Sequence, residues 1–285
     1  MNFGLHWRIR RVIRNSSVAW QTAIGTARGN AVSAYWWIGV KNFGDLLTPV
    51  LLKSYGHTPV LVPPGKCSVV STGSILGMIQ GDYSGVILGS GLLSPEHAKS
   101  FPNANIVAVR GELTRDLIGA PQSTILGDPG ILSCQLLKQR ERKTAVVGIV
   151  PHYADRSDRR ITDIAHRYPG QVRIINVQRS PSKVIREIDR CAHILSSSLH
   201  GLIAADSLGI PNGWIELSGR VAGNGFKFRD YYSAYQETCA PAHISGEETP
   251  EELVAYTRKP SVHIREAQGE MHQTFLTLIS ACMKR

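Results

Sequence analysis

The sequence predicts an α/β protein built from two Rossmann-like domains that face each other, followed by C-terminal helices that pack back on them. Short apolar runs recur along the chain, and each ends at a glycine or a polar turn. Helical patterns follow several of these runs, as expected for parallel strands joined by helices. Continuous apolar strands are typical of a parallel sheet covered on both faces. A charged segment at residues 140–143 divides the runs into two series, which predicts two domains.

The first series predicts an N-terminal domain over residues 34–140. Its strands are expected in the segments AYWWIGV, VVSTGSIL, GVILGSGLL, NIVAVRG and STILGDPGIL. A helix is expected at residues 46–55, because Asp45 lies near its start and Gly56 follows its end. A second helix is expected at about residues 113–117.

The second series predicts a C-terminal domain over residues 141–285. Its strands are expected in AVVGIV, VRIINV, HILSSS and NGWIEL, and its helices in SKVIREIDRC and LHGLIAADSLG. The segments EELVAYTRK and MHQTFLTLISACM have helical patterns and are the helices expected to pack back on the body.

Composition indicates a folded protein with anionic partners. Of the 285 residues, 42% are hydrophobic and 19% are charged, which excludes a disordered chain. The formal net charge of +10 favours nucleic acid, an anionic membrane surface or phosphorylated substrates. No nucleic-acid-binding motif is visible, so a nucleic-acid partner is not expected. Neither a signal peptide nor a membrane-spanning run is visible, and a cytoplasmic location is expected.

The cysteines indicate free thiols in a reducing compartment. The five are far apart, odd in number and without a CxxC pair. They are Cys67, Cys134, Cys191, Cys239 and Cys282. Because no closely spaced cysteine and histidine ligands occur, a zinc site is not expected.

Residues 1–33 form a basic N-terminal arm with two interpretations. Leu5, Ile9, Val12 and Ile13 fall near helical spacing among several arginines. The arm could be an amphipathic helix in peripheral contact with the inner face of the plasma membrane. It could instead be a terminal helix that packs on the body with its charges in water, which is the interpretation we favour.

Polar residues follow the predicted strands of the first domain. In open α/β sheets, ligands bind at the carboxyl ends of the strands. Asn42, Gly44 and Asp45 follow the first strand: the glycine permits close approach of a ligand, and Asn42 and Asp45 can bind hydroxyls. Asp45 could instead only cap the following helix. The turn of Gly89, Ser90 and Gly91 could contact a phosphate or a sugar, although such turns are common.

Arg110 and Asp128 end neighbouring strands of the first domain. An arginine at the end of an apolar strand needs an anionic partner. That partner is either an anionic substrate or an acid of the protein, for which Asp128 is the first candidate because it ends the next strand.

In the second domain, two strand ends carry candidate residues. His152 follows AVVGIV, and Ser197, Ser198, Leu199 and His200 follow HILS. Backbone amides and hydroxyls at a helix N-terminus can bind phosphate. His200 on the first turn would point into the cleft, where a histidine can carry a proton near neutral pH. Farther along, Lys227 and Arg229 lie among aromatic residues, either in a loop facing the cleft or in an ordinary surface segment.

These segments in this order resemble the polysaccharide pyruvyl transferase family. The matching segments are KNFGD, the GSG turn, VAVRGELTR, LGDP, GIVPHYAD, SSSLHGLIAADSLGIP and GFKFRDYY. The resemblance implies a glycosyltransferase-B-like fold, and it implies neither a metal nor a cofactor. It also implies transfer of pyruvate from phosphoenolpyruvate to two hydroxyls of one sugar in an exopolysaccharide, capsule or cell-wall glycan, with a ketal and free phosphate as products. The acceptor could be lipid-linked.

The resemblance also suggests roles for the candidate residues. His200 would be the general acid, and Arg110 would hold the carboxylate or phosphate of the donor. The helix N-terminus at Ser197 and Ser198 would bind the remaining phosphate charge. Asn42 and Asp45 would contact the acceptor, so the first domain is the expected acceptor side and the second the donor side.

One position departs from some family members, which carry an arginine where this chain has Ser198. The charge of the donor must then be met elsewhere, and His152, Lys227 and Arg229 are the candidates. Two other functions stay open: a nucleotide-sugar glycosyltransferase of the same architecture, and a non-catalytic module that binds anionic glycan.

Overall fold

The computed structural model describes residues 29–282, and its first half contains a parallel sheet. Six strands pair in parallel in the order β2-β1-β3-β4-β5-β6. The strands are β1 (Ala31–Tyr35), β2 (Thr58–Leu61), β3 (Val69–Val70), β4 (Val86–Leu88), β5 (Asn105–Val109) and β6 (Ile125–Leu126).

The second half contains another parallel sheet, in the order β11-β10-β9-β7-β8. Its strands are β7 (Ala145–Val150), β8 (Val172–Ile174), β9 (Cys191–Ser196), β10 (Asn212–Glu216) and β11 (Ala242–His243). The prediction of an α/β protein with two Rossmann-like parallel sheets is therefore confirmed.

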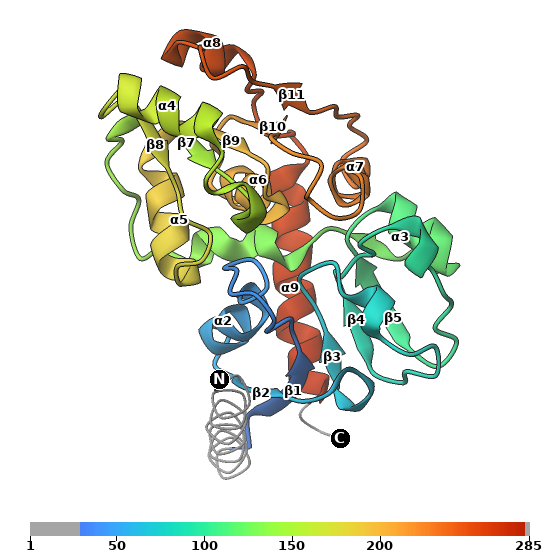
Figure 1. Cartoon of the computed structure of the whole chain (residues 1–285). Helices are drawn as coiled ribbons and strands as arrows, with labels where there is room; N and C mark the ends of the chain where they lie inside the picture. Colours follow the sequence, from blue (N-terminus) through green and yellow to red (C-terminus); the bar gives the residue numbers. More distant parts are fainter. Residues whose placement is uncertain (1–28, 283–285) are drawn as a thin grey trace, which may run out of the picture.

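Helices connect and cover the strands (Figure 1). They are α2 (Leu47–Ser54), α3 (Glu112–Ile118), α4 (Arg159–Arg167), α5 (Pro181–Asp189), α6 (Leu199–Ser207), α7 (Phe226–Ser233), α8 (Pro250–Ala255) and α9 (Ile264–Cys282). The 3-10 helices are η1 (Pro64–Lys66), η2 (Leu76–Met78), η3 (Pro95–His97), η4 (Pro129–Leu136) and η5 (Tyr153–Asp155). On α5, the predicted apolar face of Val184, Ile185 and Ile188 is buried.

The two halves share one hydrophobic core. η4 lies between them, and its Ile131 and Leu132 are buried in the same cluster as Leu51 of α2 and Leu202 of α6. Apolar side chains from both halves leave water together, which holds the sheets in a fixed relation.

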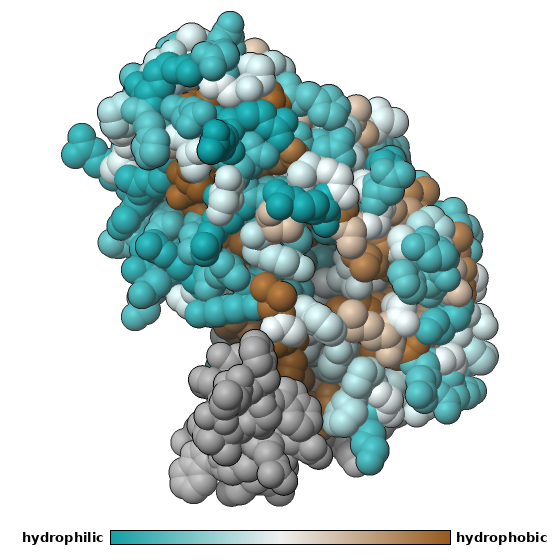
Figure 2. Space-filling model, in the orientation of Figure 1, coloured by the Kyte–Doolittle hydropathy of each residue, from teal (hydrophilic) through white to brown (hydrophobic). Residues whose placement is uncertain are grey.

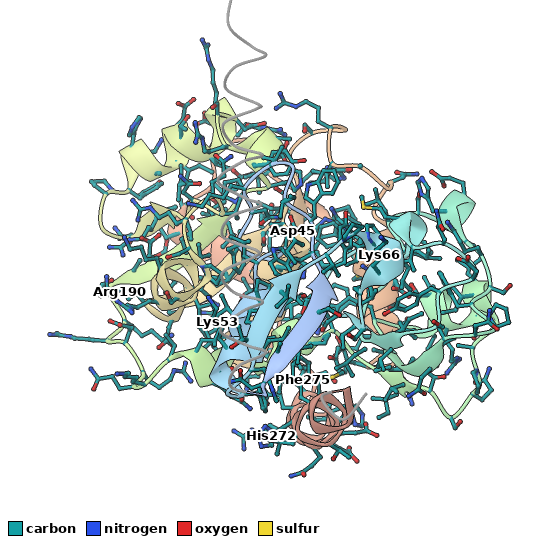
Figure 3. The ribbon with its side chains drawn as sticks, turned by 90° about the horizontal axis from the view of Figure 1, so that it is seen from below. Asp45, Lys53, Lys66, Arg190, His272 and Phe275 are labelled. Atoms are coloured by element: carbon teal, nitrogen blue, oxygen red, sulfur yellow. The ribbon has the colours of Figure 1, made fainter. Side chains whose placement is uncertain are left out.

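The long helix α9 packs back across both halves, as predicted (Figure 1). Tyr55, after α2, forms a 2.6 Å hydrogen bond with His272 and lies 5.1 Å from Phe275, measured between ring centroids. Figure 3 labels both residues on α9. Gln268 of the same helix donates to the carbonyl oxygens of Ile131 and Ser207. α9 therefore joins the first half, the linker and α6.

Several predicted boundaries were wrong. β1 begins at Ala31 and ends at Tyr35, and the apolar residues Trp37, Ile38 and Val40 that were assigned to it are exposed in a loop. The fifth predicted strand is reduced to β6, because the proline that follows begins η4. Three further elements, β2, β11 and α4, were not predicted.

The segment GFKFRDYY forms helix α7, which was also not predicted. Six of its residues are buried, among them Lys227 and Asp230. A helix that is buried on most of its faces has no amphipathic pattern, so no helical periodicity marks this segment.

Three further expectations concern the cysteines, membrane-spanning helices and the N-terminal arm. Cys67 and Cys191 are buried and free, as expected. Within residues 29–282, no helix has both the length and the apolarity to cross a bilayer. The proposed membrane contact falls on residues 1–20 of the arm, which lie outside the described residues.

Candidate active site

A cavity of about 240 Å³ lies where the carboxyl ends of the strands of both sheets meet. Its first-half residues follow β1, β3 and β4, and its second-half residues follow β7, β9 and β10. The lining comprises Trp37, Asn42, Asp45, Ser74, Ile75, Met78, Leu93, His152, Tyr153, Ser198, Leu199, His200, Arg220, Ala222 and Lys227. The topology thus brings seven of the predicted site residues together: Asn42, Asp45, His152, Ser198, Leu199, His200 and Lys227.

His200 occupies the first turn of α6, directly after the end of β9. The residue is 6% exposed, and its ring meets the edge of Phe43 from the first half. Its Nε2 lies 3.7 Å from Oδ2 of Asp128, and neither atom has a hydrogen-bond partner among the described residues. A buried carboxylate on one side of an imidazole restricts the orientation of the ring. His200 is therefore placed as a proton donor at the cavity wall.

Asp128 is held for this role by the backbone of the linker. Its Oδ1 accepts a 2.8 Å hydrogen bond from the amide of Gly130, and its side chain is fully buried. The sequence suggested Asp128 as the first candidate partner of Arg110, but the two residues do not pair. Asp128 does not line the cavity either, so its contact with a substrate would pass through His200.

Because Gly44 has no side chain, the first half of the chain packs directly against His200. A Cβ on Gly44 would overlap the imidazole. We predict that Gly44→Ala lowers kcat by at least about tenfold because the ring must shift from Asp128, with a cost in stability of about 1–3 kcal/mol. Steady-state kinetics and urea unfolding measure the two effects. The control is Gly269→Ala in α9, where a Cβ has open space. Unchanged kcat in Gly44→Ala would contradict this placement.

Asp45 and Asn42 supply polar groups from the first half. The N-cap of α2 is Leu46, so Asp45 does not cap the helix and is left to line the cavity. Burial raises the pKa of Asp45 to about 6, although His200 and Lys227 nearby act to lower it. Asn42 accepts a 3.3 Å hydrogen bond from the amide of Gly44 through its side-chain oxygen, and its side chain also hydrogen-bonds the carboxylate of Asp45.

Lys227 supplies a buried cation from α7. It is 8% exposed, and its Nζ lies 5.5 Å from the centroid of the Phe228 ring. Burial, with a further contribution from Arg110, lowers the pKa of Lys227 to about 8, while Asp45 and Asp155 oppose this shift. A desolvated ammonium group with so little surrounding water is well placed to bind an anionic ligand.

His152 lines the cavity from the second half of the chain, and its imidazole is neutral near pH 7. Burial and the nearby Lys227 lower the pKa of His152 to about 4. Its Nδ1 accepts a 3.3 Å hydrogen bond from the amide of Ala154, which leaves Nε2 as the protonated nitrogen. His152 can therefore donate a hydrogen bond to a ligand near neutral pH, but it does not add a positive charge.

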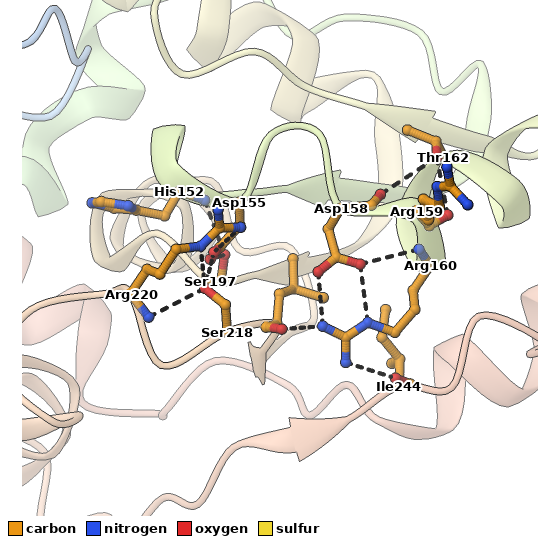
Figure 4. A network of polar contacts seen from close by, with 11 residues as sticks. His152, Asp155, Asp158, Arg159, Arg160, Thr162, Ser197, Ser218, Arg220 and Ile244 are labelled. Carbon is orange, nitrogen blue, oxygen red and sulfur yellow. Dashed lines mark hydrogen bonds and ion pairs between the residues drawn. The ribbon is translucent and has the colours of Figure 1, made fainter.

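The serines after β9 have different positions. Ser198 is the N-cap of α6 and makes no side-chain capping bond, so its hydroxyl can serve a ligand beside the helix N-terminus. Ser197 does not line the cavity. Its hydroxyl donates to Oδ2 of Asp155 at 2.9 Å and accepts from the amide of His152 at 2.9 Å (Figure 4). Ser197 thus fixes the His152 loop rather than facing the cavity.

Arg220 is a cavity residue that the sequence did not indicate. It lies in the loop after β10, its side chain is 64% exposed, and its Nη2 is 3.9 Å from Oδ1 of Asp155. Ser218 donates to the same carboxylate and accepts from Nε of Arg220 (Figure 4). Buried Asp155 therefore anchors both the Arg220 loop and, through Ser197, the His152 loop.

Comparison with known proteins shows the family of this chain. A family model described as polysaccharide pyruvyl transferase matches residues 7–219, well over half of the chain. The chain belongs to the polysaccharide pyruvyl transferase family. The predicted resemblance to this family is confirmed.

Two curated relatives and one solved structure are similar to this family member. Uncharacterized protein L143 of Acanthamoeba polyphaga mimivirus is 35% identical over 53% of this chain and 54% of its own length. Succinoglycan biosynthesis protein ExoV of Rhizobium meliloti (strain 1021) is 29% identical over 49% of this chain and 43% of its own. The chain thus spans about half the length of these relatives. An α-glucosyltransferase in complex with UDP and DNA matches 90% of this chain and 99% of its own, with a TM-score of 0.36 and 8% identity.

Arg110 of this family member lies behind the cavity wall and not in it. Its guanidinium is fully buried and donates to Asp230 at 2.8 Å, to Ser74 at 2.5 Å and to the carbonyl oxygen of Leu92 at 2.5 Å. Its acid partner is Asp230 of α7, and not Asp128. Since Ser74 lines the cavity, Arg110 positions this hydroxyl and joins the two halves.

The GSG turn is also outside the cavity, which corrects its prediction as a ligand-binding turn. Ser90 is buried and donates to the carbonyl oxygen of Gly73 at 2.8 Å. Gly89 has a φ of +83°, and a Cβ there would overlap Pro129. A Cβ on Gly91 would lie 2.6 Å from Nη2 of Arg110. The glycines are therefore needed for close packing around Arg110 and η4.

Arg229 does not reach the cavity. Its Nη2 donates to the carbonyl oxygen of Asn224 at 2.7 Å on the exposed side of α7. Of the two cations in GFKFRDYY, the helix turns only Lys227 toward the cavity.

The buried charge of Asp45 predicts a pH-dependent stability difference. Because its folded-state pKa is raised from 3.8 to about 6, the folded protein retains a proton that the unfolded chain loses between these pH values. Stability is therefore lost as the pH rises through this window. We predict that Asp45→Asn is more stable than the natural chain by about 3 kcal/mol at pH 7.5, with the difference falling below about 1 kcal/mol near pH 4. Urea unfolding at both pH values measures this, and equal stability at pH 7.5 would contradict it.

Proposed function

We propose that the protein transfers pyruvate from phosphoenolpyruvate to two hydroxyls of a saccharide, forming a cyclic ketal and releasing phosphate. Membership of the family supports a polysaccharide pyruvyl transferase, and the donor and the ketal are the finer part of this proposal. The observation that carries it is His200, backed by a buried Asp128, in a cavity that also holds the buried cation Lys227.

The second half of the cavity suits an anionic donor. Lys227 and Arg220 supply positive charge, and Ser198 with the amides at the start of α6 supplies neutral donors. Some family members have an arginine at the position of Ser198. In this chain, Arg220 supplies the positive charge that such an arginine would give. Phosphoenolpyruvate carries both a carboxylate and a phosphate, so it can engage several of these groups together.

The first half of the cavity suits the hydroxyls of a sugar. Asn42, Asp45 and Ser74 provide donors and acceptors for them, and Trp37 with Tyr153 across the cavity provides aromatic surface. Arg110 acts here as a positioning residue through its bond to Ser74. We therefore assign the first half to the acceptor and the second half to the donor.

The reaction then uses His200 as a general acid. Its proton passes to the methylene carbon of phosphoenolpyruvate, which becomes the methyl group, and positive charge develops at C2. One sugar hydroxyl forms a bond to C2 and loses its proton, for which Asp45 is the nearby carboxylate. The bond from C2 to the phosphate oxygen breaks, the second hydroxyl closes the ketal at C2, and its proton leaves with the phosphate.

Donor binding tests this proposal against a nucleotide-sugar glycosyltransferase. We expect phosphoenolpyruvate to raise the melting temperature, because a ligand that binds only the folded state stabilises it. UDP-glucose at the same concentration is expected to have no such effect. Stabilisation by UDP-glucose and not by phosphoenolpyruvate would overturn the donor assignment.

The cellular setting remains a prediction. We expect the reaction on the cytoplasmic side of the plasma membrane, with an acceptor that could be lipid-linked and that belongs to an exopolysaccharide, capsule or cell-wall glycan.

A further inference from the structure

A second cavity, of about 570 Å³, lies along the exposed side of α5. We call it the α5 groove. Its cations are Lys41, Arg179, Lys183, Arg186 and Arg190. The surface over α4 and α5 is largely hydrophilic in Figure 2. The groove thus has the lining of a site for a charged ligand and not for an apolar one.

The positive charge of the α5 groove is only partly neutralised within the protein. Arg179 pairs with Glu187, and Arg186 and Arg190 pair with Glu141 at 3.5 and 3.0 Å. Five cations therefore face two carboxylates, which leaves three positive charges. Lys41 and Lys183 have no ion pair with any residue of the described chain.

The helix itself adds to this field. Ser180 is the N-cap of α5, lines the groove and makes no side-chain capping bond. The positive end of the helix dipole favours an anion here, although Pro181 has no N–H and the amide of Lys183 donates to the carbonyl oxygen of Ser180. Cations and a helix N-terminus in one groove point to a ligand with several closely spaced negative oxygens.

The α5 groove adjoins the acceptor side of the active-site cavity. Lys41 of the groove directly precedes Asn42 of the cavity. The loop that holds both is fixed by a 2.8 Å hydrogen bond from the amide of Phe43 to the carbonyl oxygen of Val177. Val177 is followed by Gln178 and Arg179, which line the groove. One loop of the first half therefore connects the two sites.

We infer that the α5 groove binds a phosphate or diphosphate ester carried by the acceptor, while the sugar of that acceptor lies in the active-site cavity. The inference rests on the proposed function, because it assigns the Asn42 side of the cavity to the acceptor. The donor has its own cations in Lys227 and Arg220 on the opposite side. An anion in the groove therefore belongs to the other substrate.

The direct test measures binding of inorganic pyrophosphate by calorimetry, with phosphoenolpyruvate present to occupy the donor side. We expect Lys183→Glu to weaken this binding by about tenfold or more, because the charge reversal acts within a few ångströms of the anion. Lys183 is exposed, so folding should be unaffected. The matched control is Lys66→Glu, the same charge change on the far side of Asp45 from Arg190 (Figure 3).

Two results of this measurement would overturn the inference. One is equal pyrophosphate affinity in Lys183→Glu and Lys66→Glu. The other is displacement of pyrophosphate by phosphoenolpyruvate, which would place the anion in the donor site. If phosphoenolpyruvate does not bind at all but Lys183-dependent pyrophosphate binding persists, the donor proposal fails and the groove stands as an anion site.

Two further measurements separate an acceptor ester from a membrane surface. With a sugar 1-diphosphate acceptor, Lys183→Glu is expected to raise KM about tenfold and leave kcat unchanged, and with the phosphate-free sugar to change neither. Sedimentation with anionic lipid vesicles is expected to be the same for both variants. Loss of vesicle binding in Lys183→Glu with unchanged pyrophosphate affinity would make the groove a membrane contact and overturn the inference.

Discussion

His200→Ala is expected to lower kcat about 10³-fold while phosphoenolpyruvate still raises the melting temperature of the variant. The imidazole is the group that Asp128 orients from behind, and no other residue of the described cavity wall is placed as a general acid in this way. Binding of the donor depends more on Lys227, Arg220 and the start of α6. Acid catalysis and donor binding should therefore separate in this variant.

The control for this prediction is His166→Ala, which removes an exposed histidine of α4. Its kcat and donor binding are expected to equal those of the natural chain. If His200→Ala retained full turnover, His200 would not be the general acid. If the natural chain bound the donor and an acceptor without any turnover, a non-catalytic glycan-binding module would be favoured.

Asp230→Ala is expected to lower the free energy of unfolding by about 3–5 kcal/mol, because it leaves the buried guanidinium of Arg110 without its counter-charge. Asp230 also accepts hydrogen bonds from the amide and the hydroxyl of Thr114, at 2.7 Å each. Its loss therefore leaves three donors unsatisfied at the contact between α7 and α3. Urea unfolding measures the change.

Arg110→Ala should also destabilise the fold by several kcal/mol, for the same reason. This differs from the role suggested by the resemblance, in which Arg110 would hold the carboxylate or phosphate of the donor. Arg229→Ala, which removes the exposed arginine next to Asp230, is the matched control and should change stability by less than about 0.5 kcal/mol. If Asp230→Ala had the same free energy of unfolding as the natural chain, the buried ion pair would not hold the two halves together.

The sequence located much of the cavity because topology alone decides which strand ends meet. Asn42, Asp45, His152 and His200 each follow a short apolar run, and parallel strands place all such positions at one edge of their sheet. That rule needs only local signals, namely where each strand ends and which residue comes next.

These local signals could not predict contacts between residues that are far apart in the sequence. Arg110 and Asp230 are 120 positions apart, and only the docking of α7 on α3 brings them together. The same limit hid the role of Gly91, which makes room for Arg110 rather than for a ligand. Asp128 was noticed at its strand end, but its partner His200 comes from the other half of the molecule.

Loop residues were missed for a different reason. Arg220 lies in an irregular segment between β10 and α7 and is held by Ser218 and Asp155. Irregular segments have no periodicity to indicate which side chain faces inward. The available signal was chemical: Ser198 lacks the charge of an arginine, and another arginine near a strand end could have been sought.

The most direct measurement incubates the purified protein with phosphoenolpyruvate and a panel of galactosides, glucosides and N-acetylmannosaminides, each free and as the 1-diphosphate. Phosphate release and product mass are followed together. The account predicts phosphate release that depends on one sugar and is matched by the mass gain of a pyruvate ketal. No phosphate release with any acceptor, together with no stabilisation by phosphoenolpyruvate, would contradict it and favour a nucleotide-sugar donor.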